Sequence, residues 1–468
     1  MFFKRYTHMS HRVVQCQVAR GNFIYDYCDS NARLAKLLYN SALFRIRQVF
    51  TGYDRNCLSD NQKQVFTEIA VLKEVFPSIN VSRVISYTHL EKLMRATHNP
   101  DFFAGLPMQA AQAVLKQAVS DFKNWLSALR DYRKDPSKYL GKPKMPHYQK
   151  NDSMTFTFTN QDAVLYFTDN GTLLKFPLLK ERLFLPNIEK GSVLKEVKVK
   201  PFYDRYIISL TLETNASVVR TDSEMPNICA VDFGVDNFAT IVCNDNSSRL
   251  YKGGAVLSNC QWFYKSRAKA VRIITKGHKS VNVSSRYINA LSVYHYNFVH
   301  DQCHKISRSI VRYCLEHRAG TIVLGTNKHW KQNANIGKQN NQNFVSMPVA
   351  VLKDMIAYKA SEEGIRIIMQ EESYTSKADI TSMDYIPTYG VDDDKADFSG
   401  SRIKRGLYKC ANGLIINADC NGASNIMRKA FTDAWKDTHD FSFLAEPEVF
   451  GFHELNPQSN PVKGIVAV

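Results

Sequence analysis

The second half of the sequence alternates short apolar runs with longer helix-like runs, and this order limits the folds that the chain can adopt. The stretch ICAVDFGVDNFATIVC (228–243) predicts two strands joined by a tight turn. The elements expected after it are a strand near 249–252, helical sequence to 317 with a break around 277–284, a strand at 321–325, a helix near 348–363, a strand at 365–370 and a helix after Asp419. This alternation predicts an α/β domain.

The first half of the sequence predicts helices followed by antiparallel strands. A short strand is expected within residues 1–25. Helical periodicity runs through 26–135 and is strongest at about 107–130, where apolar residues recur at three- and four-residue steps. Residues 151–222 carry strand patterns, including the alternating run MTFTFT at 154–159. We therefore expect a small antiparallel barrel or sheet there, and an α+β multidomain fold for the whole chain.

The chain carries a large positive charge. Lys and Arg number 61 against 44 Asp and Glu, so the formal charge is +17 and the pI about 9.3. Such an excess favours a polyanionic partner, with nucleic acid ahead of an anionic membrane surface. We find neither an apolar run of about 18 residues nor the apolar core of a signal peptide, and therefore expect no membrane segment and a cytoplasmic location. Ten cysteines without a CxxC pair are expected to be reduced thiols.

Two aspartates stand at the ends of elements in the second half of the chain. Its element order, a three-stranded meander followed by alternating helices and strands, is that of an RNase H-like fold. Asp232 ends the first strand of this order, and Asp419 lies at or near the start of the last helix. Carboxylates on adjacent elements can hold two Mg²⁺ ions about 4 Å apart for phosphodiester hydrolysis. The alternative for either aspartate alone is an ordinary cap or turn residue.

Five motifs occur in the same order as in a known family. AVDFGVDNFAT and INADCNGASNI resemble the first and third RuvC motifs of the transposon-encoded TnpB nucleases and their type V CRISPR relatives. YTSKADI resembles the stretch before the TnpB zinc ribbon, KPKMPHY the basic connector, and YDYCDSNARLAKLLYNSALFRIRQ the N-terminal recognition region. The resemblance implies a Mg²⁺-dependent, RNA-guided DNA endonuclease with two metal ions. Its expected partners are a guide RNA and target double-stranded DNA, with no membrane partner.

The resemblance also implies a division of the chain into domains. We expect wedge-domain strands at 1–25, a helical recognition domain at 26–135, a β-barrel wedge domain at 136–222, an RNase H-like RuvC nuclease domain at 223–435 with a non-zinc insertion at about 375–414, and a C-terminal tail at 436–468.

The second RuvC motif departs from the family pattern. The family usually places a glutamate at the end of the second RuvC strand, and here Gly325 stands in that position. Glu371 and Glu372 follow the strand at 365–370, which we expect to lie beside the strand at 321–325, so either carboxylate could reach the metal ions. Some TnpB-like and Fanzor proteins carry a rearranged site with a Glu in an ExYTSK context, which favours Glu372. The predicted catalytic and metal-binding residues are Asp232, Glu372 and Asp419, with Glu371 still open as the third carboxylate and an exposed acidic turn as the alternative.

The zinc ribbon of the family has no counterpart in the sequence. Family members typically carry two CxxC pairs between YTSK and the third motif. Here Ala378 stands where the first cysteine is expected, and only Cys410 lies between 375 and 419. Four ligands cannot be assembled locally, so no structural zinc is expected.

Clusters of basic residues are candidate contacts for nucleic acid. They occur in the connector at 133–150, in the helical stretch at 264–279, in the SRIKRG stretch (401–406), and in the loop at 328–344, where aromatic rings could stack on bases. A solvated face or linker is the alternative for each cluster. The predicted nucleic-acid-binding residues are Lys142, Lys144, Lys265, Arg267, Lys269, Arg272, Trp330, Lys331, Arg402, Lys404 and Arg405.

Two other functions stay open from the sequence. A nuclease-inactive, RNA-guided DNA-binding protein would share the same architecture, and Gly325 favours it because glycine has no side chain to bind metal. A transposase that acts on transposon ends is a third possibility, but the sequence shows no tyrosine or histidine pair with the spacing of an HUH site.

Overall fold

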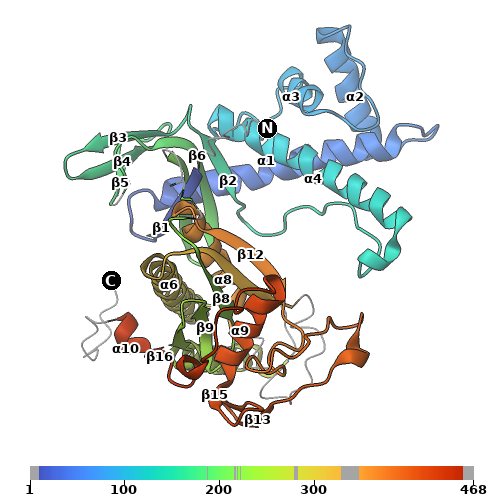
Figure 1. Cartoon of the computed structure of the whole chain (residues 1–468). Helices are drawn as coiled ribbons and strands as arrows, with labels where there is room; N and C mark the ends of the chain where they lie inside the picture. The colour runs from blue at the N-terminus through green and yellow to red at the C-terminus, as the bar shows by residue number, and fades with distance from the viewer. Residues whose placement is uncertain are drawn as a thin grey trace. The chain divides into compact units, whose positions relative to one another are not determined.

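The computed structural model describes residues 10–186, 188–214, 218, 220–221, 223–278, 283–327 and 347–456 (Figure 1). These residues fall into two compact units, which we call the N-terminal unit (10–214) and the C-terminal unit (218–456). Within the described ranges, no helix is long and apolar enough to cross a membrane.

Four α-helices belong to the N-terminal unit: α1 (Tyr25–Gly52), α2 (Asp60–Val75), α3 (Tyr87–Ala96) and α4 (Met108–Lys134). The sequence predicts α4 well, because its apolar residues repeat on one face. That face buries Ala111, Leu115, Ala118 and Phe122. The helix ends before Pro136, which opens the short 3-10 helix η1 (Pro136–Lys138).

The basic connector at 133–150 is attached to the helices. Trp125 of α4 donates a hydrogen bond to Pro143 O at 3.1 Å. Asn40 of α1 donates to Gln149 O at 3.0 Å, and Gln149 N donates to Asn40 Oδ1 at 2.7 Å. The connector thus begins in α4 and η1, and residues 139–150 then form a strap along α1 and α4 on which Lys142 and Lys144 are exposed.

The strands of the N-terminal unit form two open antiparallel sheets. The first has the order β1–β7–β6–β2, with β1 (Ser10–Ala19), β7 (Arg205–Thr214), β6 (Val193–Phe202) and β2 (Phe156–Thr159). The second has the order β3–β4–β5, with β3 (Val164–Thr168), β4 (Gly171–Lys175) and β5 (Arg182–Leu185). Phe156 and Phe158 are buried, as the alternation in the sequence predicts. The expected barrel is not found among the described strands, because β1 and β2 remain unpaired sheet edges.

A six-stranded mixed sheet forms the centre of the C-terminal unit. Its order is β12–β11–β8–β9–β10–β16, with β8 (Asn227–Asp232), β9 (Asn237–Cys243), β10 (Ser247–Lys252), β11 (Ala319–Thr326), β12 (Arg366–Glu371) and β16 (Glu448–Phe450). β8, β9 and β10 form the expected meander, and β11 pairs in parallel with both β8 and β12. β16 comes from the segment expected to be a tail and pairs in parallel with β10.

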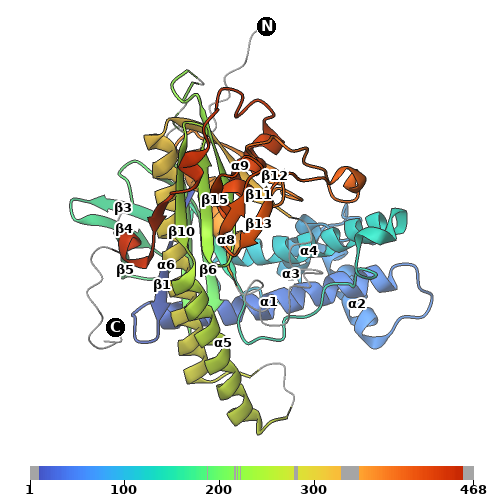
Figure 2. The ribbon, with the colours of Figure 1, turned by 60° about the horizontal axis from the view of Figure 1, so that its bottom comes forward.

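Helices cover both faces of this sheet. They are α5 (Gly254–Thr275), α6 (Arg286–Glu316), α8 (Val349–Glu362) and α9 (Ala418–Ala430), with a short α10 (Phe452–Leu455) near the end. Successive residues of β8 point to opposite faces of the sheet. Cys229 and Val231 pack with residues of α6 and α8, whereas Ala230 packs with residues of α9. Figure 2 shows α5 and α6 lying side by side as an antiparallel pair.

The segment between β12 and α9 folds around the buried carboxylate of Asp379 and the half-buried carboxylate of Asp384. It contains η2 (Asp393–Lys395) and a small sheet of β13 (Ser401–Lys404), β14 (Leu407–Lys409) and β15 (Ile415–Asn417); η3 (Ser442–Leu444) follows α9. Asp379 is fully buried and accepts hydrogen bonds from Thr381 N at 2.8 Å and Ala411 N at 2.7 Å. Asp384 accepts from Asp379 N at 2.8 Å. These carboxylate–backbone bonds hold the insertion, in which Cys410 is a buried free thiol.

Candidate carboxylate site at the strand ends

Asp232 is the last residue of β8, so the strand carries its side chain to the end of the sheet. Phe233 N donates to Asp232 Oδ1 at 2.8 Å. α9 approaches closely at Gly422, where an added Cβ would lie 3.0 Å from Asp232 Oδ2. Burial raises the pKa of Asp232, and the charges of Glu372 and Asp419 raise it further. The three predicted carboxylates therefore interact electrostatically.

Glu372 reaches this region from β12, across the end of β11. Gly325 of β11 pairs with Gln370, and Thr326 pairs with Glu371. Glu372 N then donates to Thr326 O at 3.2 Å, so Glu372 is the first residue beyond the paired strands. A Cβ at Gly325 would lie 2.6 Å from Glu372 Oε2, closer than any real contact of a Cβ atom. The carboxylate of Glu372 thus lies against the bare backbone of Gly325.

Glu371 is engaged elsewhere. Its Oε2 forms an ion pair with Lys429 Nζ of α9 at 2.6 Å, and its Oε1 accepts from Ser373 N at 2.7 Å. Burial opposes the charge of Glu371, but the hydrogen bonds from Lys429 and Ser373 lower its pKa overall. Burial instead raises the pKa of Glu372, with Lys353 opposing this effect. Of the two glutamates, the structure places Glu372 beside Asp232 and ties Glu371 to α9.

Asp419 lies in the first turn of α9, which Asn417 caps by accepting from Asp419 N at 3.0 Å. Asn237 Nδ2 of β9 donates to Asp419 Oδ2 at 2.6 Å. Arg402 Nη2 of β13 lies 3.5 Å from Asp419 Oδ1. The sequence predicts Asp419 as a ligand and Arg402 as a nucleic-acid contact, and the structure brings the two together.

The chemistry of these residues suits Mg²⁺, because carboxylate oxygens are the ligands that this ion prefers. Burial raises the pKa of Asp232 most, and the negative charges of Glu372 and Asp419, which a divalent ion would compensate, raise it further. Among the described residues, however, no three His, Cys, Asp or Glu side chains converge closely enough to hold an ion as they stand. Asp419 uses its oxygens for Asn237 and Arg402 instead. The donor types therefore suit a metal, and the side chains would have to move together to bind one, with Asp419 changing its partners.

Sequence reasoning missed Lys353 and Asn237 at this site. Lys353 of α8 donates from Nζ to Gly325 O, and its charge acts on Glu372 and Asp232. The only signal in the sequence is a lysine on the apolar face of the helix expected near 348–363. Asn237 lies in the first RuvC motif, AVDFGVDNFAT, and its polar side chain at the start of an apolar strand is a comparable signal.

The predicted basic contacts lie in several places. In the C-terminal unit, Arg402, Lys404 and Arg405 are exposed, and Arg405 forms an ion pair with Asp236 in the turn after β8. Lys265, Arg267, Lys269 and Arg272 are exposed along α5. Lys142 and Lys144 lie on the strap of the N-terminal unit. Trp330 and Lys331 lie outside the described residues.

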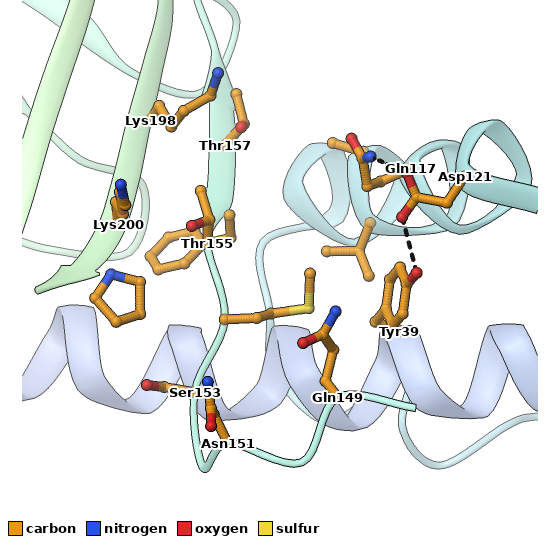
Figure 3. Close-up of a pocket in the computed structure, with 15 residues that line it drawn as sticks. Tyr39, Gln117, Asp121, Gln149, Asn151, Ser153, Thr155, Thr157, Lys198 and Lys200 are labelled. Carbon is orange, nitrogen blue, oxygen red and sulfur yellow. Dashed lines mark hydrogen bonds between the residues drawn. The ribbon is translucent and has the colours of Figure 1, made fainter. Parts of the chain in front are cut away.

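The N-terminal unit contains a polar pocket of about 430 Å³ that sequence reasoning did not identify (Figure 3). Its polar part is lined by amide and hydroxyl side chains and two lysines of β6: Gln117, Gln149, Asn151, Ser153, Thr155, Thr157, Lys198 and Lys200. Apolar residues, among them Val114, Met154 and Phe156, line the rest. On one wall, Tyr39 donates to Asp121 Oδ2 at 2.8 Å, and Gln117 donates to Asp121 Oδ1 at 2.6 Å. Both lysines rise from the strand side of the pocket in this view. Cations and amides together suit a ligand with phosphates and polar edges.

Two family models match the second half of the chain. Residues 210–331 match a family described as a probable transposase, OrfB_IS605, and residues 350–426 match the TNB domain of Cas12f1-like proteins. TnpB-like protein ORF457 of Acidianus two-tailed virus is 25% identical over 210 residues, which cover 43% of this chain and 42% of the relative. The CRISPR-associated endodeoxyribonuclease Cas12f1 of Sulfoacidibacillus thermotolerans is 32% identical over 133 residues, 28% of this chain and 27% of the relative. The matched segment thus spans less than half of either curated relative.

Solved structures align over more of the chain at lower identity. A Cas12f1–sgRNA–target DNA complex covers 86% of this chain and 82% of its own, with a TM-score of 0.48 and 12% identity. Alicyclobacillus acidoterrestris C2c1 with single-guide RNA covers 84% and 70%, with a TM-score of 0.35 and 9% identity. The family matches and the two curated relatives confirm the resemblance that the motifs predict: over residues 210–331 and 350–426, this chain is similar to TnpB proteins and to the Cas12f1 branch of type V CRISPR effectors.

Proposed function

We propose that this protein is an RNA-guided DNA endonuclease whose cleavage site consists of Asp232, Glu372 and Asp419. The observation that carries the proposal is the carboxylate of Glu372 against Gly325, with its charge and that of Asp419 acting on Asp232. Three carboxylates at the ends of adjacent elements are a suitable donor set for two-metal phosphodiester hydrolysis. The similarity to a Cas12f1 endodeoxyribonuclease and to a TnpB-like protein supports the same activity.

Two Mg²⁺ ions, when bound, would activate the attacking water and stabilise the leaving oxygen. Asp232, Glu372 and Asp419 would hold them through carboxylate oxygens. The hydrogen bond from Phe233 N orients Asp232, and the contact with Gly325 orients Glu372. Arg402 is 48% exposed at the mouth of the site, so it can exchange Asp419 for a DNA phosphate.

In this proposal the guide RNA reads the target sequence by base pairing, and the protein binds backbones and a short flanking motif. The net charge of +17 suits a polyanionic heteroduplex. We assign backbone contacts to the exposed cations of α5, to Lys142 and Lys144 of the strap, and to the Arg402–Arg405 stretch. The polar pocket of the N-terminal unit is a further contact, with Lys198 and Lys200 placed for phosphates and its amides for base edges. Trp330 and Lys331 stay predictions from the sequence.

The domain roles follow the same proposal. The helices α1 to α4 would form a recognition domain, the two open sheets of the N-terminal unit a wedge domain, and the six-stranded sheet with its helices a RuvC nuclease domain. The insertion at about 375–414 would stand in place of a zinc ribbon, held by Asp379 and Asp384.

The test uses the full-length protein with its guide RNA, Mg²⁺ and a matched DNA duplex. Wild-type protein should cut, and Asp232→Ala, Glu372→Ala and Asp419→Ala should each abolish cutting while guide-directed DNA binding is retained. Normal cleavage by Asp232→Ala would show that the site is wrong.

A second candidate function is guided DNA binding without cleavage, which Gly325 favours because β11 contributes no carboxylate. Wild-type protein that binds matched DNA, yet cuts it in neither Mg²⁺ nor Mn²⁺, would establish this alternative.

A further inference from the structure

Lys353 is a buried lysine at the carboxylate site. It lies in the second turn of α8, is only 9% exposed, and donates a hydrogen bond from Nζ to Gly325 O. The same Nζ lies 4.8 Å from the centre of the Phe233 ring. Both neighbours belong to the site, because Glu372 lies against Gly325 and Phe233 N binds Asp232.

Burying an ammonium group is costly unless opposite charges compensate it. Burial lowers the pKa of Lys353, whereas the charges of Glu372 and Asp232 raise it. The lysine in turn acts to lower the pKa of both carboxyl groups. Lys353 therefore compensates both carboxylates, which repel each other, and removing the lysine leaves each of them with an uncompensated charge.

The second cation of the site is held differently. Arg402 lies 3.5 Å from Asp419, but its side chain is 48% exposed and stands on a surface strand. Lys353 is enclosed by the protein and bound to the backbone of β11. Arg402 can therefore leave the site when substrate arrives, whereas Lys353 is a permanent part of it.

Gly325 links the lysine to the relocated glutamate. The carbonyl oxygen of Gly325 accepts the hydrogen bond from Lys353, and the carboxylate of Glu372 lies where a side chain on Gly325 would be. One residue of β11 thus positions a cation and an anion that arrive from two other elements, α8 and the end of β12.

We propose that Lys353 is a positioning residue and the resident counter-charge of this site, which offsets the charges of Glu372 and Asp232 and weakens the binding of divalent ions. A fixed positive charge neutralises part of the carboxylate charge and repels an incoming divalent cation. The inference rests on the proposed function, because it takes Asp232, Glu372 and Asp419 as the metal ligands.

The first test is a titration of the full-length protein with Mn²⁺, in which the electron paramagnetic resonance signal of the free ion measures how much ion is bound. Binding at the site is defined as the Mn²⁺ binding that is lost in the Asp232→Ala variant. Lys353→Met keeps the apolar stem and removes the charge, so it should tighten this binding by roughly threefold or more. Lys353→Arg keeps the charge and should bind Mn²⁺ like wild type. Unchanged or weaker binding in Lys353→Met would overturn the proposal, because a merely structural lysine would loosen the site when removed.

α8 offers a matched control in Lys359. This lysine is 3% exposed and donates to His304 O at 2.7 Å and Ser307 Oγ at 2.6 Å, and none of the three carboxylates contributes to its pKa shift. Lys359→Met removes the same charge from the same helix and should leave Mn²⁺ binding unchanged. Equal tightening in both variants would show a general charge effect and overturn the specific role of Lys353.

A second measurement needs no metal and separates this inference from the proposed function. In EDTA, Lys353→Met should lower the Tm of otherwise wild-type protein by about 4 °C. In a Glu372→Gln background the loss should be less than half of that, because the lysine has one carboxylate fewer to compensate. An equal loss in both backgrounds would refute the coupling. If Lys353→Met does not fold, Lys353→Gln replaces it in both measurements. Wild-type protein without Asp232-dependent Mn²⁺ binding would contradict the metal site. The comparison of Tm losses in the two backgrounds would still decide the role of Lys353.

Discussion

Glu372 occupies the space that a side chain at Gly325 would need. A Cβ on Gly325 would lie 2.6 Å from Glu372 Oε2 and 2.8 Å from Ile426 Cδ1. The glycine of β11 and the glutamate beyond β12 are therefore complementary, because the bare backbone of one makes room for the carboxylate of the other. A carboxylate that β11 does not supply reaches the same place from the neighbouring strand.

Gly325→Ala should impair cleavage without unfolding the protein. The added methyl group would displace the carboxylate of Glu372, and a shift of about 1 Å at a reacting centre can lower the rate about 100-fold. Single-turnover cleavage measures the loss, and circular dichroism checks the fold. Gly254→Ala is the matched control, because nothing lies within 4 Å of its added Cβ. Equal rates for Gly325→Ala and wild type would contradict the contact described here.

Moving the glutamate to β11 should restore part of the activity that Glu372→Ala removes. With Glu372 truncated, the added Cβ at 325 still lies 2.8 Å from Ile426 Cδ1, and Ile426→Val removes that atom. The triple variant Gly325→Glu, Glu372→Ala, Ile426→Val should therefore cut faster than Glu372→Ala in the same assay. Gly325→Glu with Glu372 retained should be inactive, and wild-type activity in that variant would contradict the steric argument.

Glu371 and Glu372 should respond differently to the same substitution. Glu372→Gln should slow cleavage roughly 100-fold, which corresponds to about 2.7 kcal/mol of transition-state stabilisation. Glu371→Gln should leave the chemical step almost unchanged but lower the Tm, because Lys429 loses a partner at 2.6 Å. Cleavage rates and thermal melts of both variants decide this. A larger rate effect from Glu371→Gln would exchange their proposed roles.

Asp379→Asn should destabilise the insertion between β12 and α9. Its two carboxylate oxygens accept bonds from the backbone amides of Thr381 and Ala411. In asparagine, one of these donors would face an NH2 group and the other would keep only a neutral acceptor. The expected cost is about 1–3 kcal/mol in the free energy of unfolding by denaturant. The same change at Asp394, which is exposed, should cost far less. Equal stability of the two variants would mean that Asp379 does not hold the insertion.

The exposed basic residues of α5 should carry RNA contacts. Changing Lys265, Arg267, Lys269 and Arg272 together to Gln should weaken guide RNA binding and flatten the dependence of log K on log salt by about 0.7–0.9 for each lost phosphate contact. Filter binding at several salt concentrations measures the slope. A control variant with four exposed lysines changed to Gln, at Lys73, Lys123, Lys175 and Lys180, removes the same charge. An equal change of slope in both variants would mean that net charge alone matters.

Local patterns in the sequence were enough to predict the element order of the C-terminal unit. Apolar periodicity predicts β8 to β12 and the helices α5, α6, α8 and α9 at nearly their observed positions, because that periodicity reflects which face of each element is buried. The ends of β8 and the start of α9 follow from it, and with them the placement of Asp232 and Asp419. The same pattern predicts that the strands carrying Gly325 and preceding Glu371 are neighbours.

Long-range contacts settle what those local patterns leave open. Successive residues of an extended chain point to opposite sides, so adjacent glutamates separate, with Glu371 on Lys429 and Glu372 on Gly325. Lys353 and Arg402 join the site only because α8 and β13 are packed beside it. The strands of the N-terminal unit form open sheets instead of the expected barrel, because closure depends on pairing between strands distant in sequence. Composition and periodicity describe one segment at a time, whereas each of these features depends on which distant segment lies opposite.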